Sequence, residues 1–161
     1  MDAFEFVMDQ GPLARAPCMK MKISLVDVRL HEDAIHRGPA QVYPAVREAI
    51  TGAMRKADAC LLEPVQIHLI EVPDRFLNAI TKLVGSKRGQ PLEVKQEEME
   101  TQVKAKIPVA EMIGWSNDLR SATEGRGVSS LYDQLFERIP QSLQADVIKK
   151  IRNRKGLKEN E

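Results

Sequence analysis

The sequence predicts an α+β fold, because segments with a two-residue apolar repeat are interleaved with segments whose apolar residues recur at helical spacing. The 161 residues are 43% hydrophobic and carry a formal net charge of +1, a balance typical of a folded chain rather than a disordered one. At roughly 100–200 residues per domain, this length suits one ordinary domain or two small ones.

The first part of the chain is predicted to contain helix, strand, loop and helix in that order. Apolar residues among acids over 2–9 fit the last turns of a helix, which the Gly-Pro pair at 11–12 terminates. Apolar and polar residues alternate over 19–30, with one change of phase, and predict a long strand. A polar loop over 31–41 follows. Pro44 suits the first position of the next helix. Because the first helix lacks an N-cap, we expect the chain to be part of a longer protein.

The middle of the chain repeats a strand-helix-strand pattern after a connector over 61–64. The expected elements are a strand over 65–69, a helix over 73–85, a short strand over 92–94, a strand over 99–107, a helix over 109–122 and a last strand with Leu131 in the core. This β-α-β-β-α-β order is the ferredoxin-like arrangement, in which two helices cover one face of a sheet. Phe76 and Trp115 lie at helical core spacing, so we expect them to pack in the core rather than to stack on bases.

The chain closes with a helix predicted to begin at Ser142 as its N-cap and to end at Gly156. Six of the ten residues over 149–158 are basic, although the net charge of the chain is close to zero. Such a cluster is either a solvated helix end, where cations are favoured by the helix dipole, or a patch that attracts phosphates or acidic surfaces. The sequence leaves both possibilities open.

Several classes of protein are disfavoured. The segment 85–89 lacks the spacing and the Lys-Ser/Thr ending of a phosphate-binding loop, so no nucleotide site is expected. No run approaches the roughly 18 apolar residues of a membrane helix, and the acidic N-terminus does not resemble a signal peptide, so a cytoplasmic location is expected. Cys18 and Cys60 are expected to be small apolar residues rather than nucleophiles.

The loop over 31–41 carries the candidate functional residues. His31, Glu32 and His36 resemble a zinc-protease motif in composition, but two histidines five positions apart would lie about 140° apart around a helix. No metal site is therefore predicted, and a small metalloenzyme remains a rival hypothesis. The polar side chains of the loop could contact RNA, or could simply face water. These side chains are Asp33, His36, Arg37 and Gln41, on a loop that contains Gly38.

The same segments resemble a known family, the archaeal and eukaryotic elongation factor 2. Its domain IV is matched by Gly11-Pro-Leu-Ala14, Leu30-His-Glu-Asp-Ala-Ile-His36-Arg-Gly-Pro-Ala-Gln41 and Pro44-Ala45. Its domain V is matched by Leu62-Glu-Pro64, Lys87-Arg-Gly89, Lys104-Ala-Lys-Ile-Pro-Val109, Gly114-Trp115 and Leu119-Arg-Ser-Ala-Thr123-Glu-Gly125. Its C-terminal helix is matched by Ile151-Arg-Asn-Arg-Lys-Gly-Leu157, in the archaeal form.

The resemblance implies a ribosomal translocase driven by GTP hydrolysis, of which these residues would be the C-terminal part. It divides the chain into part of domain IV over 1–61, with a fold like half of ribosomal protein S5 domain 2, a ferredoxin-like domain V over 62–136, and a C-terminal helix over 137–161 that returns to domain IV. GTP and magnesium would bind the GTPase domain, which these residues do not include. The chain alone is therefore expected not to be an enzyme and to hold no cofactor.

The resemblance also assigns roles within the loop. It implies that His36 is converted to diphthamide, the residue that diphtheria toxin ADP-ribosylates, and that Asp33, Arg37, Gly38 and Gln41 contact the ribosome. The partners implied are the ribosome, with tRNA and mRNA at the decoding region, and the enzymes of diphthamide synthesis. Gly38-Pro39-Ala40 replaces the glycine-rich run of many eukaryotic members, which again suits the archaeal form. A free-standing RNA-binding module that uses the basic tail remains an alternative.

Overall fold

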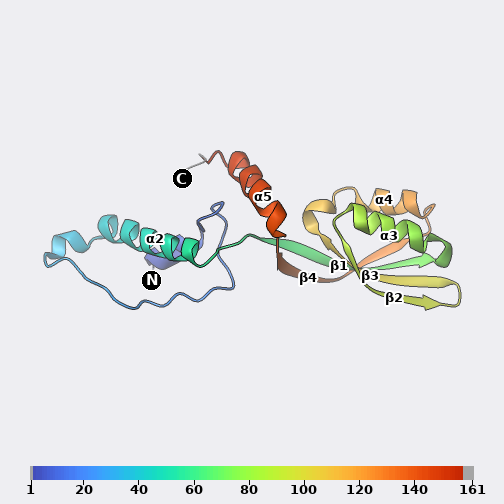
Figure 1. Cartoon of the computed structure of the whole chain (residues 1–161), viewed down its shortest axis with the longest axis horizontal. Coiled ribbons are helices and arrows are strands. Elements are labelled where there is room, and N and C mark those ends of the chain that lie inside the picture. Colours follow the sequence, from blue (N-terminus) through green and yellow to red (C-terminus); the bar gives the residue numbers. More distant parts are fainter. Residues whose placement is uncertain (1, 158–161) are drawn as a thin grey trace. The chain divides into compact units, whose positions relative to one another are not determined.

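The computed structural model describes residues 2–157 and has an α+β fold with two compact units (Figure 1). The helical unit consists of Met1–Leu61 with Ile139–Glu161, and the sheet unit consists of Leu62–Arg138. No helix within residues 2–157 combines the length and the apolar character needed to cross a membrane.

The sheet unit is a four-stranded antiparallel sheet with strand order β2-β3-β1-β4. Its elements are β1 (Leu62–Pro73), η2 (Asp74–Phe76), α3 (Leu77–Ser86), β2 (Gln90–Glu97), β3 (Glu100–Pro108), η3 (Val109–Glu111), α4 (Trp115–Ala122) and β4 (Val128–Arg138). The predicted order of strands and helices is present, and α3 and α4 lie over the same face of the sheet (Figure 1).

The core of the sheet unit lies between that face and the two helices. Its buried side chains are Ile70, Val72, Phe76, Ile80, Val84, Val103, Ala105, Ile107, Trp115 and Leu119. On β3 every second residue is buried, as the alternation of that segment predicts. Phe76 and Trp115 are 9% and 5% exposed, so both are core residues as predicted.

Four predictions for the sheet unit are wrong in detail. The expected connector over 61–64 belongs largely to β1, since Leu62–Pro64 pair with β4. Leu131 pairs with the buried His68 but is itself 55% exposed, because β4 is an edge strand of the sheet, and no residue of β4 is buried. The predicted helix over 109–122 begins only at Trp115, since Gly114 has φ +81. The strand predicted from 99 begins at Glu100, and Met99 is 82% exposed.

The Lys87-Arg-Gly89 motif joins the end of α3 to the rest of the sheet unit. The Arg88 guanidinium contacts the Glu63 carboxylate at 3.0 Å and the Glu111 carboxylate at 2.8 Å. These hydrogen bonds, with Glu63 as the larger cause, raise the pKa of Arg88. Lys87 pairs with Asp118 of α4 at 2.7 Å. The motif therefore has a structural role, in that it links β1, α3, η3 and α4.

A buried histidine lies beneath α4 on the covered face of the sheet. His68 is 8% exposed, and its Nδ1 lies 2.9 Å from the Ser129 Oγ, which also accepts a hydrogen bond from the Trp115 indole at 3.1 Å. The other ring nitrogen, Nε2, lies 3.1 Å from the Gln66 Oε1. Burial lowers the pKa of His68 below its ordinary value of 6.5, because the charged imidazolium would lose its hydration.

We expect this histidine to make the sheet unit less stable in acid. Below pH 6.5, and above the lower pKa of the folded state, the unfolded chain binds a proton at His68 that the folded chain does not. The free energy of unfolding should therefore fall as the pH decreases through this window, and should fall less steeply in a His68→Gln variant. Urea denaturation of both proteins above and below pH 6.5 measures the difference. Equal pH dependence in the two proteins would contradict the assignment.

The helical unit contains α1 (Asp2–Met8), α2 (Pro39–Lys56) and α5 (Gln141–Arg154), with a short 3-10 helix η1 (Ala34–Arg37) before α2. Val7 of α1 is buried against Ile50 and Met54 of α2. A second cluster contains Ala14, Leu61 and Ile139, against which the apolar face of α5 packs. This face is made by Leu143, Val147, Ile148 and Ile151, as predicted.

Part of the basic tail is used inside the helical unit. The Lys155 ammonium donates to the Ala14 and Arg15 carbonyls at 3.0 and 2.6 Å, and the Arg152 guanidinium donates to the Leu13 carbonyl at 3.0 Å. These two cations therefore fasten the loop that follows α1, in addition to any favourable interaction with the helix dipole.

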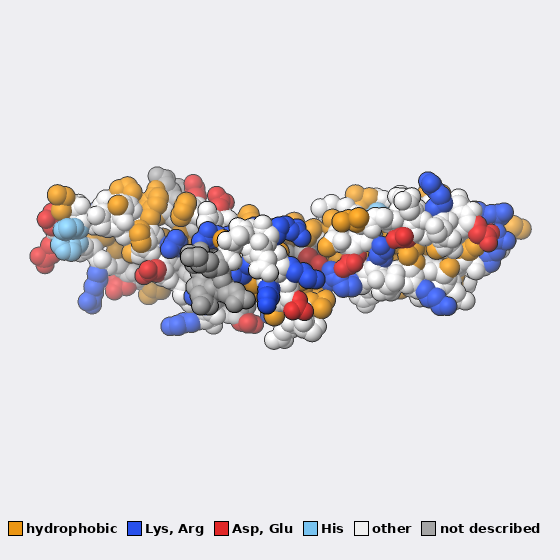
Figure 2. Space-filling view, turned by 90° about the horizontal axis from the view of Figure 1, so that it is seen from above, with side chains coloured by type: hydrophobic (Ala, Val, Ile, Leu, Met, Phe, Trp, Pro, Cys, Tyr) orange, Lys and Arg blue, Asp and Glu red, His pale blue; other side chains and the backbone are white. Residues whose placement is uncertain are grey.

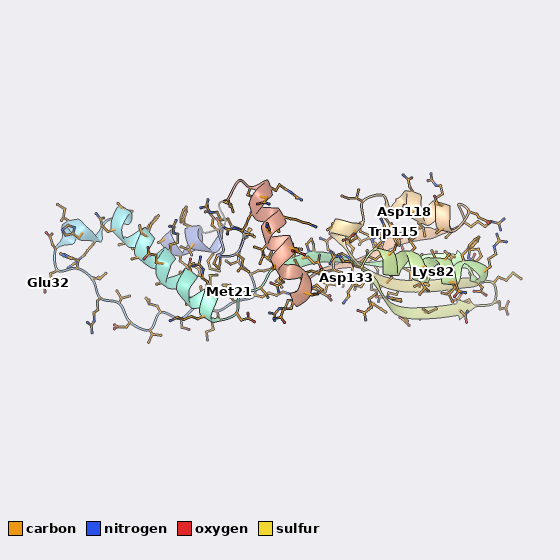
Figure 3. The ribbon with its side chains drawn as sticks, turned by 45° about the horizontal axis from the view of Figure 1, so that its top comes forward. Met21, Glu32, Lys82, Trp115, Asp118 and Asp133 are labelled. Carbon is orange, nitrogen blue, oxygen red and sulfur yellow. The ribbon has the colours of Figure 1, made fainter. Side chains whose placement is uncertain are left out.

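The strand predicted over 19–30 is wrong. The segment carries no strand, and its side chains include Leu25 at 82% and Val26 at 93% exposure. Figure 3 labels Met21 on this extended segment. A strand requires hydrogen bonds to a neighbouring strand, and the only sheet in the described part of the chain is the one formed by β1–β4.

Two helix starts also differ from the prediction. α2 begins at Pro39 rather than Pro44, because Gly38 is its N-cap and the missing N–H of proline costs nothing at the first helical position. Pro44 lies inside the helix. α5 begins at Gln141 after Pro140, so Ser142 lies within its first turn and does not cap it.

Candidate functional site

The candidate site is the His36 loop, defined as residues 31–41, which joins the extended segment 19–30 to α2. All of its residues are exposed except Gly38, which is half-buried. Figure 3 labels Glu32 at the end of the helical unit beyond the start of α2, and Figure 2 shows histidine side chains on the surface there beside acidic ones. The loop is thus presented outward, with α2 as its rigid support.

The Asp33 side chain shapes the first half of the loop. Its Oδ1 accepts a hydrogen bond from the Ile35 backbone N–H at 3.0 Å, which caps η1. The Asp33 backbone N–H donates to the Nδ1 of His31 at 3.1 Å, and its carbonyl accepts from the His36 N–H at 3.2 Å. Asp33 therefore positions its neighbours on both sides, as an N-cap residue does.

Arg37 closes the loop on itself. Its Nε donates to the His31 carbonyl at 2.7 Å, and its Nη2 donates to the Glu32 carbonyl at 2.8 Å. These bonds span six and five residues and hold the start of the loop against its end. The sequence predicts that Arg37 contacts RNA or the ribosome. In the structure its guanidinium mainly holds the loop together, although it remains exposed at the surface.

The His36 ring is exposed at the surface and is held in place by its neighbours in the loop. It meets the His31 ring edge-on, with 4.6 Å between the ring centroids and 67° between the planes. His31 is itself held by the Asp33 N–H, so the His36 imidazole rests on a fixed neighbour and otherwise faces solvent. This arrangement suits a residue that another molecule must reach.

Gly38 and Gln41 belong to the start of α2 rather than to a loop tip. The Gly38 carbonyl accepts hydrogen bonds from the Gln41 and Val42 N–H groups at 3.1 and 3.0 Å. A Cβ at Gly38 would lie 3.2 Å from the Gln41 Oε1. The Gln41 side chain is exposed on the first turn of the helix, where a partner of the loop would also meet it.

Within residues 2–157 no three His, Cys, Asp or Glu side chains come together in a way that could hold a metal ion. His31 and His36 are adjacent, as the rival metalloenzyme hypothesis requires, but a third ligand is lacking in this part of the chain. Cys18 and Cys60 are both free and half-buried, and burial raises the pKa of the Cys18 thiol.

Comparisons with known proteins place both units in one class, the elongation factors of translation. Residues 1–58 match the family model "Elongation factor G, domain IV", and residues 60–147 match "Elongation factor G C-terminus". The chain belongs to the elongation factor 2 family and corresponds to the C-terminal region of its archaeal members.

Two relatives illustrate the degree of similarity. The chain is 52% identical over 157 residues to elongation factor 2 of Nanoarchaeum equitans and 48% identical over 158 residues to that of Methanopyrus kandleri. Each match covers 98% of this chain but only 21% and 13% of the relative. The matched regions are C-terminal ones, and the 161 residues contain no GTPase domain.

A solved structure supports the fold. A crystal structure of a protein from Thermus thermophilus matches 94% of this chain with a TM-score of 0.77, at 23% identity and over 23% of that protein. At this identity the match concerns the fold alone.

The sequence identifies the loop residues but not the contacts that they make. The edge-on contact of the His31 and His36 rings and the hydrogen bonds of Arg37 to backbone carbonyls are not predicted, since both depend on how the chain turns between 31 and 37. One signal of the loop conformation is present in the sequence. An Asp side chain commonly accepts a hydrogen bond from the backbone N–H two residues later, as Asp33 does from Ile35.

Proposed function

We propose that this chain is the ribosome-facing C-terminal part of a GTP-dependent translocase, and that the His36 loop reaches the decoding region while tRNA and mRNA move. The observation that carries the proposal is the exposed His36, on a loop before α2 that Arg37 holds together by hydrogen bonds to backbone carbonyls. The chain that presents this loop belongs to the elongation factor 2 family. In this proposal the helical unit contributes part of a domain IV related to ribosomal protein S5 domain 2, and the sheet unit is the ferredoxin-like domain V. GTP and magnesium act in the full-length factor, in the cytoplasm.

The proposal includes the division of the chain and the modification of His36. Residues 1–61 are part of domain IV, residues 62–136 are domain V, and residues 137–161 are a helix that returns to domain IV. His36 is the substrate of the diphthamide-synthesis enzymes, which must reach its ring. Exposure of the whole loop supports this role, and so does the support of the ring by His31, since a fixed ring costs a modifying enzyme less ordering entropy.

Asp33 and Arg37 then act mainly by holding the loop in shape for the ribosome. Gly38 and Gln41 present the first turn of α2 to the same partner. The Arg37 charge adds long-range attraction to RNA phosphates even while its guanidinium binds backbone carbonyls.

The experiment uses the full-length factor with His36→Ala, and with Glu32→Gln as the control, because the Glu32 side chain is exposed on the same loop and the variant keeps the backbone carbonyl that binds Arg37. The His36→Ala factor should lose the modification and ADP-ribosylation by diphtheria toxin completely, and should translocate several-fold more slowly or with more frame errors. His36 is exposed, so the free energy of unfolding should change by less than about 0.5 kcal/mol. Glu32→Gln should keep the modification. A large drop in melting temperature for His36→Ala, or normal translocation, would contradict the proposal.

A further inference from the structure

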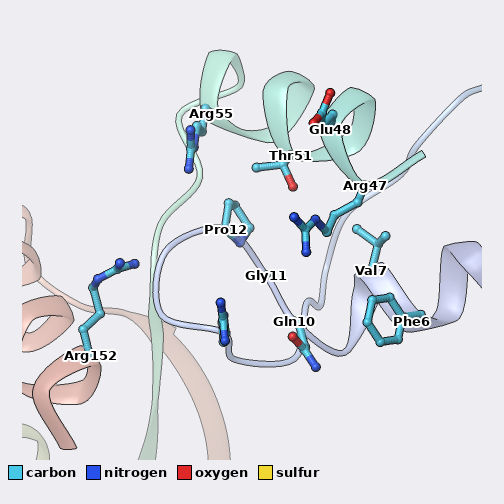
Figure 4. Close-up of a pocket in the computed structure, with 11 residues that line it drawn as sticks. Phe6, Val7, Gln10, Gly11, Pro12, Arg47, Glu48, Thr51, Arg55 and Arg152 are labelled. Carbon is cyan, nitrogen blue, oxygen red and sulfur yellow. The ribbon is translucent and has the colours of Figure 1, made fainter. Parts of the chain in front are cut away.

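A second surface of the helical unit combines positive charge with exposed aromatic rings, and it adjoins the end of the His36 loop at Pro39 and Ala40. Its first part is a cavity of about 460 Å³ between α2, the loop that follows α1, and α5 (Figure 4). Four arginines and one glutamate line it, which gives the lining a formal charge of +3 where the whole chain carries +1. The charged residues are Arg15, Arg47, Glu48, Arg55 and Arg152.

Two of these arginines are available to a ligand. Arg47, Thr51 and Arg55 are spaced four residues apart and form one stripe along α2. The stripe is about 12 Å long at 1.5 Å per residue. Within residues 2–157, neither the Arg47 nor the Arg55 guanidinium has a hydrogen bond or ion pair, in contrast to Arg152, which binds the Leu13 carbonyl. Figure 4 shows the Arg47 side chain directed from α2 toward the loop at Gly11.

The second part of the surface is an aromatic patch, made by Phe6 and Tyr43, that adjoins the basic cavity. Phe6 of α1 and Tyr43 of α2 are stacked, with 6.2 Å between ring centroids and 29° between planes, and Phe6 is 46% exposed. They line a hollow of about 400 Å³ that is otherwise formed by the first turns of α2. Phe6 and Arg47 line both hollows, so rings and charges form one continuous surface.

We propose that this surface binds a single-stranded segment of RNA. The phosphates would lie on Arg47 and Arg55, because a guanidinium forms paired hydrogen bonds to phosphate oxygens. An unpaired base would lie against Phe6 and Tyr43. A basic groove beside aromatic rings is the combination by which proteins hold single strands without reading their sequence. The inference deepens the proposed function and rests on it in one respect, that the RNA is expected to be ribosomal.

The test is equilibrium binding of the 161-residue chain to a short fluorescent oligouridylate, measured at several salt concentrations. Arg47→Gln/Arg55→Gln should weaken binding at low salt at least about tenfold and should make the salt dependence shallower by about 1.4, or about 0.7 per lost phosphate contact. Phe6→Leu should weaken binding about fivefold or more, with the salt dependence unchanged. The matched control, Lys82→Gln/Arg126→Gln, likewise removes two positive charges, from exposed sites in the sheet unit, and should change affinity less than twofold.

Three results would overturn the inference. One is unchanged affinity of the double arginine variant while circular dichroism shows it folded. Another is an equal loss of affinity in Lys82→Gln/Arg126→Gln, which would indicate diffuse attraction. The third is equal binding of duplex RNA, an acidic peptide or anionic lipid vesicles, which would exclude a single-strand site. His36→Ala should bind the oligouridylate like the parent chain. If the arginine variants show no effect while His36→Ala still impairs the full-length factor, only this inference fails.

Discussion

Replacement of Ile70 by alanine is expected to lower the free energy of unfolding of the sheet unit by about 2–5 kcal/mol. Ile70 is 0% exposed and belongs to the cluster between the sheet and the helices α3 and α4. Removal of its outer carbons loses the favourable free energy of burying them. It also leaves a cavity that the packed strands and helices cannot collapse to fill. Trp115 is the single tryptophan of the chain and lies in the same core, so urea denaturation followed by its fluorescence reports on this unit.

Ile113→Ala is the matched control for this prediction. Ile113 carries the same side chain at 85% exposure in the turn before α4, so its truncation should change the free energy of unfolding by less than about 0.5 kcal/mol. If the two variants lost equal stability, the burial of Ile70 would not be what holds the sheet unit together.

Gly89→Ala is expected to destabilise the same unit by about 1–3 kcal/mol, for the opposite physical reason. A Cβ at this position would lie 2.8 Å from both the Val84 carbonyl oxygen and a Val84 methyl group, and 3.0 Å from an Ile107 side-chain carbon. The carbonyl is backbone at the end of α3 and accepts the Gly89 N–H at 2.9 Å, so it cannot move without loss of that bond.

Gly85→Ala is the control, and it should change the free energy of unfolding in the opposite direction. Gly85 lies in the last turn of α3, and no atom lies within 4 Å of a Cβ built there. Alanine should therefore stabilise the helix by about 0.5–1 kcal/mol through the entropy of the unfolded chain. Thermal unfolding of the two variants should shift in opposite directions. A stabilising Gly89→Ala would mean that the close contact of this turn with Val84 is not a constraint.

The sheet unit could be predicted from the sequence because most of its elements carry their own signal. The alternation of Val103, Ala105 and Ile107 identifies β3 without knowledge of its neighbours, and the spacing of Phe76, Ile80 and Val84 identifies the buried face of α3. Leu131 is exposed because β4 is an edge strand, and the place of a strand within its sheet cannot be read from the residues of that strand alone.

The helical unit was harder to predict for a related reason. The alternation over 19–30 is as regular as that of β3 on either side of its change of phase, but alternation describes which faces a strand would have and does not provide the strand that must pair with it. In the same way, Arg37 could be chosen as a charged loop residue, whereas its bonds to the His31 and Glu32 carbonyls depend on the path of the loop.

The proposed function requires that the loop present His36 both for modification and for contact with the ribosome. Peptide mass spectrometry of the protein from its native host, covering the peptide with His36, tests this most directly. We expect a mass increase confined to the His36 imidazole, with His31 of the same loop unmodified. An unmodified His36 in actively translating cells would contradict it and would leave the RNA-binding surface at Arg47 and Arg55 as the functional feature to pursue.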